Sequence, residues 1–329
     1  MLVSYKKVLG KKSSKIIITF ILLFLVLYAI PVPSVGEPVE HLVKDNDKLV
    51  EIEGIKVRYV EVQGEGNLTF VLLHGFGASV FSWREVIDNL SGYGRVIAFD
   101  RPGFGLTERV RPEALSFNPY TSEGQARVTY ELLRKLNVTS AVLVGHSAGG
   151  GVAILLALEH PELVKALVLI APAWKPYKSS FVTKIPFYLP LADKYGPLIL
   201  RKSVGQLEKI LYKAWYDKSK LTNDVVEGYK YPLRVKDWDK GLYWLMKYGG
   251  FPDITTSLSN IKAPVLIIHG ENDEIVPLNS SLELLSLMSR QSNTQLVTIR
   301  ECGHLPHEEK PEEFLAIIEL FVKELLTNY

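Results

Sequence analysis

The fold is decided by the stretch AVLVGHSAGGG, residues 141–151. Residues 141–144 are a short apolar run typical of a buried strand, and residues 150–159 predict an apolar helix. The Gly145-His146-Ser147-Ala148-Gly149 turn between them fits the Gly-x-Ser-x-Gly pattern, in which a sharp strand-to-helix turn holds a nucleophilic serine clear of a sheet. Because strand and helix flank the turn correctly, a nucleophilic Ser147 is favoured over an idle serine in a glycine-rich turn.

Strands and helices alternate outward from this turn in both directions. Short apolar strands separated by helices are typical of a mostly parallel, doubly wound α/β sheet covered on both faces. An opening hairpin is predicted over 52–62, with Gly54 at its turn. The further strands are expected at 68–73, 95–99, 141–144, 166–170, 265–268 and 295–299.

The alternation stops between residues 174 and 251. This segment contains no convincing strand, carries prolines at 176, 186, 190 and 197, and is rich in aromatic residues. We predict a helical cap over 174–251, inserted after the sixth strand into a catalytic domain made of residues 49–173 and 252–329. Residues 36–48 are polar and are interpreted as a linker.

The amino terminus has the pattern of an export segment. Residues 16–30 are apolar apart from Thr19, and five lysines precede them without an opposing acid: Lys6, Lys7, Lys11, Lys12 and Lys15. Residues 1–35 are therefore a signal anchor or a cleaved signal peptide. We predict an anchor that crosses the membrane through residues 16–30 and leaves the catalytic domain outside the cytoplasm. Secretion after cleavage is the alternative.

Charge and composition exclude several classes of protein. The formal net charge is +2, and without the five amino-terminal lysines the balance is 33 basic against 36 acidic residues, so we expect no nucleic-acid partner. Cys302 is the single cysteine, which rules out an intrachain disulfide. The histidines are scattered, and no phosphate loop or dinucleotide fingerprint is present. We expect neither a metal nor a cofactor, and the sequence does not indicate an oligomeric state.

A serine nucleophile needs a base and an acid, which follow it in the order Ser, acid, His. His304 lies in the loop after the last predicted strand, from which it can reach back to Ser147. Three acids compete in the loop after the strand at 265–268, and we favour Asp273 over Glu271 and Glu274. Its predicted task is to hold the imidazole tautomer and stabilise the imidazolium.

The oxyanion hole must supply N–H groups where negative charge develops. One is predicted from Ala148, the residue after the nucleophile. The other is predicted from Phe76, in the His74-Gly75-Phe76-Gly77 turn that follows the strand at 68–73.

The turn of Ser147, the loops of Asp273 and His304, and the turn after the strand at 68–73 resemble segments of the α/β-hydrolase superfamily. So does Asp100-Arg101-Pro102-Gly103-Phe104-Gly105, and the resemblance runs from about residue 50 to the end. The chain is similar to its capped, esterase- or lipase-like members, and Ser147 separates it from members with an aspartate nucleophile. The resemblance implies that cap aromatics line an acyl or ring pocket, but we expect most of them to form the core of the cap. The candidate substrate-binding residues are His74, His146, Trp174, Trp215 and Trp244.

The expected reaction is hydrolysis of a carboxylic ester of moderate size with an apolar group, through an acyl-enzyme. Two alternatives remain at this stage. One is a C–C bond hydrolase of ring-cleavage products, and the other is a ligand-sensing hydrolase with slow turnover.

Overall fold

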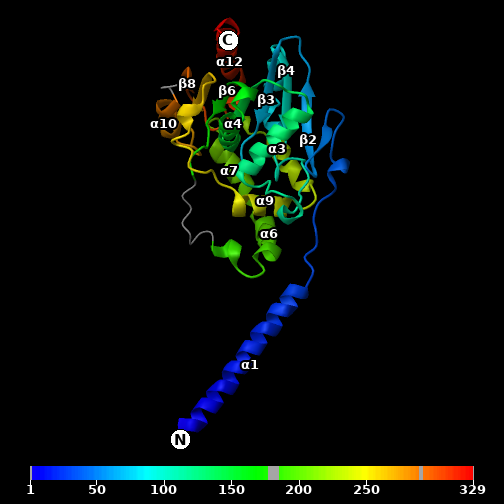
Figure 1. Ribbon diagram of the computed structural model, residues 1–329. Helices are drawn as coiled ribbons and strands as arrows, with labels where there is room; N and C mark the ends of the chain where they lie inside the picture. Colours follow the sequence, from blue (N-terminus) through cyan, green and yellow to red (C-terminus); the bar gives the residue numbers. More distant parts are fainter. Residues whose placement is uncertain (1, 177–184, 289–291, 329) are drawn as a thin grey trace.

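The computed structural model describes residues 2–176, 185–288 and 292–328, and its centre is an eight-stranded sheet (Figure 1). The strand order is β1-β2-β4-β3-β5-β6-β7-β8, and all neighbours from β4 to β8 pair in parallel. β1 and β2 form the predicted hairpin, and β2 joins β4 antiparallel. The strands are β1 (Lys48–Ile52), β2 (Ile55–Val62), β3 (Leu68–Leu73), β4 (Gly94–Phe99), β5 (Ala141–His146), β6 (Val164–Ile170), β7 (Val265–Gly270) and β8 (Thr294–Ile299).

Helices cover both faces of this sheet because its central strands are apolar on both sides. On one face, Val71 and Leu143 pack against α3 (Ser122–Lys135), α4 (Ala148–Glu159) and α10 (Leu278–Met288). On the other, Phe70 and Leu72 pack against α2 (Ile87–Ser91) and α12 (Pro311–Asn328), which the short helix α11 (Pro306–Glu309) precedes. The predicted fold class, a mostly parallel doubly wound α/β sheet, is confirmed.

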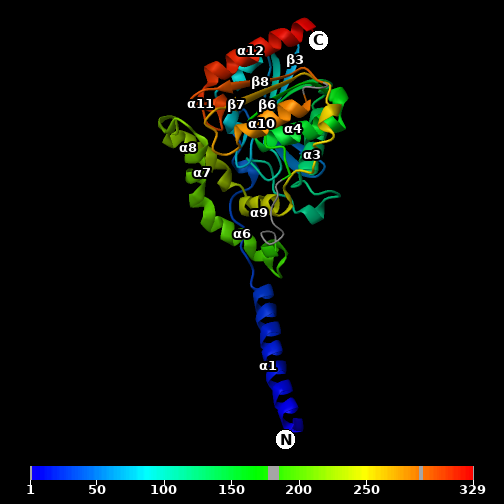
Figure 2. The ribbon, with the colours of Figure 1, turned by 90° about the vertical axis from the view of Figure 1, so that its left-hand side faces the viewer.

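Between β6 and β7 the chain leaves the sheet and forms a helical layer. This layer contains α6 (Ala192–Ser203), α7 (Leu207–Ala214), α8 (Asn223–Lys230) and α9 (Trp238–Tyr248), and Figure 2 shows it beside the sheet, on the side away from α12. We call it the cap.

The segment predicted as a linker, residues 36–48, is packed against the domain. Val39 and Leu42 are buried beside Leu106 and Val235. Glu37 pairs with Val235 in a short parallel bridge, and its carbonyl accepts a hydrogen bond from Lys236 N at 2.7 Å. The polar residues around these two apolar side chains concealed their burial.

Helix α1 (Leu2–Ala29) projects away from the domain in both views (Figures 1 and 2). Its last turn reaches α6, where Tyr195 Oη donates to the Leu27 carbonyl at 2.5 Å. Within the described part of the chain, no helix combines the length and the apolar character that crossing a membrane requires, and this finding overturns the predicted membrane anchor. The apolar part of α1 rises only about 21 Å at 1.5 Å per residue, against roughly 30 Å for a bilayer's hydrocarbon core.

Candidate active site

Ser147 sits at the junction of β5 and α4 in a backbone conformation that few residues adopt. Its φ is 51° and its ψ is −119°, and a positive φ is uncommon for any residue other than glycine. Its N–H donates to the Ile170 carbonyl at 2.8 Å, which ties the turn to β6. A Cβ at Gly149 would collide with the Leu73 carbonyl oxygen, and one at Gly145 would lie 2.6 Å from Gly150 Cα. The glycines of the motif are therefore required by close backbone approach.

The turn after β3 lies directly against this serine. A Cβ at Gly75 would come within 2.8 Å of His146 Nδ1 and 3.2 Å of Ser147 Cβ. The next residues, Phe76 and Gly77, line the same cavity as Ser147. The structure thus brings together the two segments from which oxyanion donors were predicted, Phe76 and Ala148.

Asp273 and His304 are joined by a hydrogen bond of 2.7 Å between Oδ2 and Nδ1. The other carboxylate oxygen of Asp273, Oδ1, accepts from Ile275 N at 2.7 Å and Val276 N at 2.9 Å. The side chain of Asp273 is fully buried, whereas Glu271 and Glu274 are exposed. Among the three candidate acids, Asp273 is the one that contacts the histidine.

Electrostatics keep Asp273 ionised. Burial by itself would raise the pKa of this carboxyl group. Hydrogen bonds from His269, His304 and Val276 N outweigh burial and hold its pKa below the usual range. The group is therefore a carboxylate at neutral pH, as an imidazolium partner requires.

His269 is a supporting residue that the sequence analysis did not identify. Its Nε2 lies 3.3 Å from Asp273 Oδ2 and 3.0 Å from the Val276 carbonyl. Both neighbours only accept hydrogen bonds, so Nε2 carries a proton, and Nδ1 lies 2.8 Å from Ser281 Oγ. The spacing of four residues between His269 and Asp273 was the available signal.

His304 and Ser147 face the same cavity. The structure records no hydrogen bond between Ser147 Oγ and His304, a contact that in many enzymes tightens only when substrate binds. The carbonyl of His304 accepts from His146 Nε2 at 2.9 Å, and its N–H donates to the Ala214 carbonyl at 2.7 Å. Neighbouring backbone and side chains therefore fix the loop that carries His304.

Glu309 ties this loop to the cap. Its side chain is completely buried and accepts three backbone N–H groups. These come from Gly303 at 2.8 Å, Tyr216 at 3.1 Å and Asp217 at 2.6 Å. Gly303 precedes His304, and the other two residues follow α7, so one carboxylate joins the predicted base to the cap.

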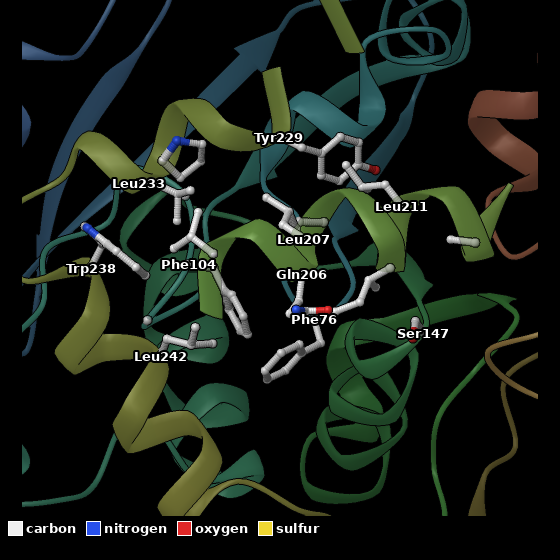
Figure 3. Close-up of a pocket in the computed structure, with 18 of the residues that line it drawn as sticks. Phe76, Phe104, Ser147, Gln206, Leu207, Leu211, Tyr229, Leu233, Trp238 and Leu242 are labelled. Carbon is white, nitrogen blue, oxygen red and sulfur yellow. The ribbon is translucent and has the colours of Figure 1, made fainter. Parts of the chain in front are cut away.

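A cavity of about 530 Å³ opens beside Ser147, between the sheet and the cap (Figure 3). Ser147 stands at one end in Figure 3, and Trp238 and Leu242 of α9 stand at the other. Most of the wall is apolar, including Phe104, Leu207 and Leu211. The residues that line the cavity include one cation, Arg109.

Of the five candidate substrate-binding residues, His146 lines this cavity and the other four do not. His74 is buried behind it, where Nδ1 donates to the Gly75 carbonyl at 2.8 Å. The remaining three are buried among other side chains, Trp174 in the core under the sheet, Trp215 beside Ala78 and Leu211, and Trp244 against Tyr120. The cap contributes Tyr229 and Trp238 instead. Tyr177 and Phe181, two further aromatic residues of the predicted cap segment, lie outside the described residues.

Two residues near His304 are more buried than their sequence context suggests. His307 is fully buried against Trp83, with ring centroids 4.6 Å apart, and contacts Ser82 Oγ at 2.8 Å. Cys302 is also fully buried, and burial raises the pKa of its thiol.

Comparison with known proteins agrees with this architecture. The family model described as alpha/beta hydrolase fold matches residues 69–311. The uncharacterized hydrolase YugF of Bacillus subtilis is 31% identical over 272 residues, which are 83% of this chain and 96% of that protein.

Two other relatives have named substrates. The 2-hydroxy-6-oxo-6-(2'-aminophenyl)hexa-2,4-dienoic acid hydrolase of Metapseudomonas resinovorans is 27% identical, over 82% of this chain and 88% of that protein. The structure of a meta-cleavage product hydrolase from Pseudomonas fluorescens, CumD, superposes with a TM-score of 0.68 at 25% identity, covering 84% of this chain and 97% of that one.

Proposed function

Because this chain belongs to the α/β-hydrolase family, we propose that it is a serine hydrolase that cleaves a C–C bond next to a carbonyl group in ring-cleavage products. The observation that carries the proposal is the similarity, over most of both chains, to hydrolases named for such substrates. The comparisons favour this alternative over the carboxylic ester that the sequence analysis preferred.

The catalytic groups that we assign come from four loops: those after β3, β5 and β7, and the loop before α11. Ser147 Oγ attacks the carbonyl carbon, and His304 takes its proton. Asp273 holds the imidazole by its Nδ1 contact of 2.7 Å and stabilises the imidazolium. The N–H groups of Phe76 and Ala148 stabilise the oxyanion.

The bond that breaks joins the carbonyl carbon to the next carbon of the dienoate. For its electron pair to be delocalised, the 2-hydroxydienoate reacts as its 2-oxo tautomer, in which the hydroxyl proton has moved to that carbon and made it saturated. The electron pair of the broken bond then enters the conjugated 2-oxo-enoate as a dienolate, which takes up the proton from His304. An acyl group remains on Ser147. Water then attacks it, releases a carboxylic acid and regenerates the serine, so one water molecule is consumed for each bond cleaved.

The test uses the full-length protein with 2-hydroxy-6-oxo-6-(2'-aminophenyl)hexa-2,4-dienoic acid and, separately, with p-nitrophenyl esters. We expect the dienoate to be cleaved to an aminobenzoic acid and a five-carbon acid, with a higher kcat/KM than any ester. Mass spectrometry of the products and absorbance of the conjugated dienoate measure this. An intact dienoate with rapid ester turnover contradicts the proposal.

Ester hydrolysis stays as a second candidate because one observation favours it. The cavity wall beside Ser147 is mainly apolar, with Leu207, Leu211 and Phe104 among its members. Such a wall suits an alkyl or aryl acyl group of moderate size. Esters of graded acyl length in the same assay separate the two candidates.

A further inference from the structure

Arg109 is an unusual member of the cavity wall. It lies in the loop after β4, and its side chain is partly buried. Its Nη1 donates to the Thr107 carbonyl. Its Nε is shielded from solvent and has no hydrogen-bond partner within the described part of the chain.

No described acid forms an ion pair with Arg109, and the segments outside the described residues contain neither Asp nor Glu. The charge of Asp100 interacts with Arg109 and raises its pKa. The Asp100 carboxylate is already engaged, because it accepts hydrogen bonds from Val80 N and Leu106 N, each at 2.7 Å, and from Arg58 Nη1 at 3.4 Å. Burial lowers the pKa of Arg109 to about 10, so the guanidinium remains charged at neutral pH. Buried charges in proteins are normally paired, so this one lacks a counter-ion.

The position of Arg109 is fixed by α9. A Cβ on Gly241 would lie 2.7 Å from Arg109 Cγ, so the helix backbone rests on the stem of the arginine. Gly241 adjoins Leu242 and lies one turn after Trp238, the two residues that Figure 3 shows at the end of the cavity away from Ser147. The stem of Arg109 therefore packs against the helix that forms the end of the cavity away from Ser147.

A second buried arginine in this region, Arg101, has a different setting. It does not line the cavity, and it donates from Nε to the His74 carbonyl at 2.9 Å and from Nη1 to Gln125. Arg101 is integrated into the turn beneath the active site. Arg109, by contrast, borders the space that a ligand would occupy.

We propose that Arg109 binds a carboxylate of the substrate and so selects acids whose cleavable carbonyl is separated from a carboxylate by an apolar or conjugated segment. This inference rests on the proposed function, because it assigns the charged end of the same substrate. Nη2 has no hydrogen-bond partner among the described residues, so the guanidinium keeps a donor that the fold leaves unused. Charge-assisted hydrogen bonds from a guanidinium to a carboxylate are among the stronger ones in proteins. The separation of the two ends of the cavity then sets the length of acid that fits.

The experiment compares matched pairs of p-nitrophenyl esters in the full-length protein. Monoesters of succinic, adipic and suberic acid carry a terminal carboxylate, and the butyrate, hexanoate and octanoate are their uncharged partners. The readout is kcat/KM of the carboxylate-bearing ester divided by kcat/KM of its uncharged partner. A general loss of activity lowers both values and leaves this ratio unchanged. We expect one chain length to favour the carboxylate, and Arg109→Gln to lower that ratio about 10- to 100-fold.

Two further variants complete the design. Arg109→Lys keeps the charge without the planar guanidinium, so we expect an intermediate ratio, and this variant decides the matter if Arg109→Gln does not fold. Arg111→Gln removes an exposed cation two residues away and serves as the matched control, with an unchanged ratio. An equal loss of kcat/KM on both members of every pair would contradict carboxylate binding by Arg109. An equal change of the ratio in the Arg111 variant would contradict it too.

The dienoic acid and its carboxyl methyl ester, assayed in the same variants, separate this inference from the proposed function. If the dienoate is not cleaved but the kcat/KM ratio of the ester pairs still depends on Arg109, the proposed C–C reaction is wrong and carboxylate binding by Arg109 is supported. If the dienoate is cleaved and Arg109→Gln lowers kcat/KM equally for the acid and its methyl ester, carboxylate binding by Arg109 is wrong and the proposed C–C reaction is supported.

Discussion

Ser147 is held at a φ of 51°, and the side chain can be changed without changing that backbone. Ser147→Ala keeps the Cβ and removes only the Oγ. We therefore expect a folded protein whose kcat falls on the order of 10⁶-fold, as happens when a triad loses its nucleophile. Thermal unfolding and kcat on the dienoate and on p-nitrophenyl butyrate measure the two effects.

A fluorophosphonate probe is the control for this variant, because it labels an activated serine independently of the substrate. The unaltered protein should be labelled at Ser147, and the variant should not be labelled. Retention of a tenth of the activity would show that another residue is the nucleophile.

Asp273→Asn keeps the shape of the side chain but removes its charge. The amide cannot favour the imidazole tautomer that Asp273 selects, so we expect kcat to fall by roughly 10⁴. Glu271→Gln and Glu274→Gln, on exposed residues of the same loop, are the matched controls and should change kcat little. A larger loss in Glu271→Gln would assign the acid to Glu271.

The same substitution has a pH signature in stability. The folded pKa of Asp273 lies below its unfolded value of about 3.9, so its ionised form stabilises the native state. That contribution is fully present above about pH 4 and is lost as the pH falls through the folded pKa. We therefore measure the free energy of unfolding by urea from pH 7 to pH 3. The difference in this free energy between the unaltered protein and Asp273→Asn should narrow below about pH 4. A constant difference would contradict the depressed pKa.

At this scale the sequence allows predictions for residues whose context is local. Ser147 was predicted from its own motif, and His304 and Asp273 from chain order and the ends of strands; the structure places Asp273 against His304 and sets His304 and Ser147 on one cavity. The contacts of Arg109 and His269 were not predictable, because each depends on what a distant or folded-back segment places beside it. The burial of His307 was not predictable either, because nothing local indicates that Trp83 packs on it.

At the scale of elements, the turn after β3 must approach the β5–α4 junction closely. Gly75→Ala would place a methyl group 2.8 Å from His146 Nδ1 and 3.2 Å from Ser147 Cβ. We expect the turn to shift and kcat to fall, with a loss of about 1–3 kcal/mol in the free energy of unfolding, typical of overpacking. Steady-state kinetics and urea unfolding measure the two quantities.

Gly205→Ala is the matched control for this change. A Cβ at Gly205 would meet nothing within 4 Å, so neither kcat nor stability should fall comparably. Unchanged kinetics in Gly75→Ala would mean that the turn tolerates displacement and does not supply an oxyanion donor.

The strands were predictable because their pattern is a direct result of burial. Residues 141–144 were expected as a strand, and β5 extends over Ala141–His146. The inward faces of the cap helices were not predictable in the same way. Trp215 and Trp238 are both aromatic residues at helix ends, yet Trp215 packs beside Ala78 while Trp238 faces the cavity. Which one meets substrate depends on how the helices dock.

At the scale of the whole molecule, the carboxylate of Glu309 connects the cap to the loop of His304. Glu309→Gln has a similar shape but turns an NH₂ group toward backbone donors that need an acceptor. We expect a loss of about 1.5–3 kcal/mol in the free energy of unfolding, the range for hydrogen bonds to charged groups, and a lower kcat because Gly303 is no longer held. Calorimetry and steady-state kinetics test both effects.

Glu312→Gln, on an exposed side chain three residues further on, is the control and should be neutral. If Glu309→Gln lowers stability but leaves kcat unchanged, the contact serves only to dock the cap. A neutral Glu309 variant would show that the three backbone N–H groups find other partners.

The buried Cys302 makes this chain convenient for site-directed spectroscopy. It is the single cysteine, it is completely buried, and its thiol pKa is raised, so maleimides at neutral pH have no reactive target in the folded protein. A cysteine introduced at one exposed cap position would therefore carry a spin label or fluorophore without background. Distances between the cap and the sheet can be measured in the native sequence background, with no need to remove a cysteine first.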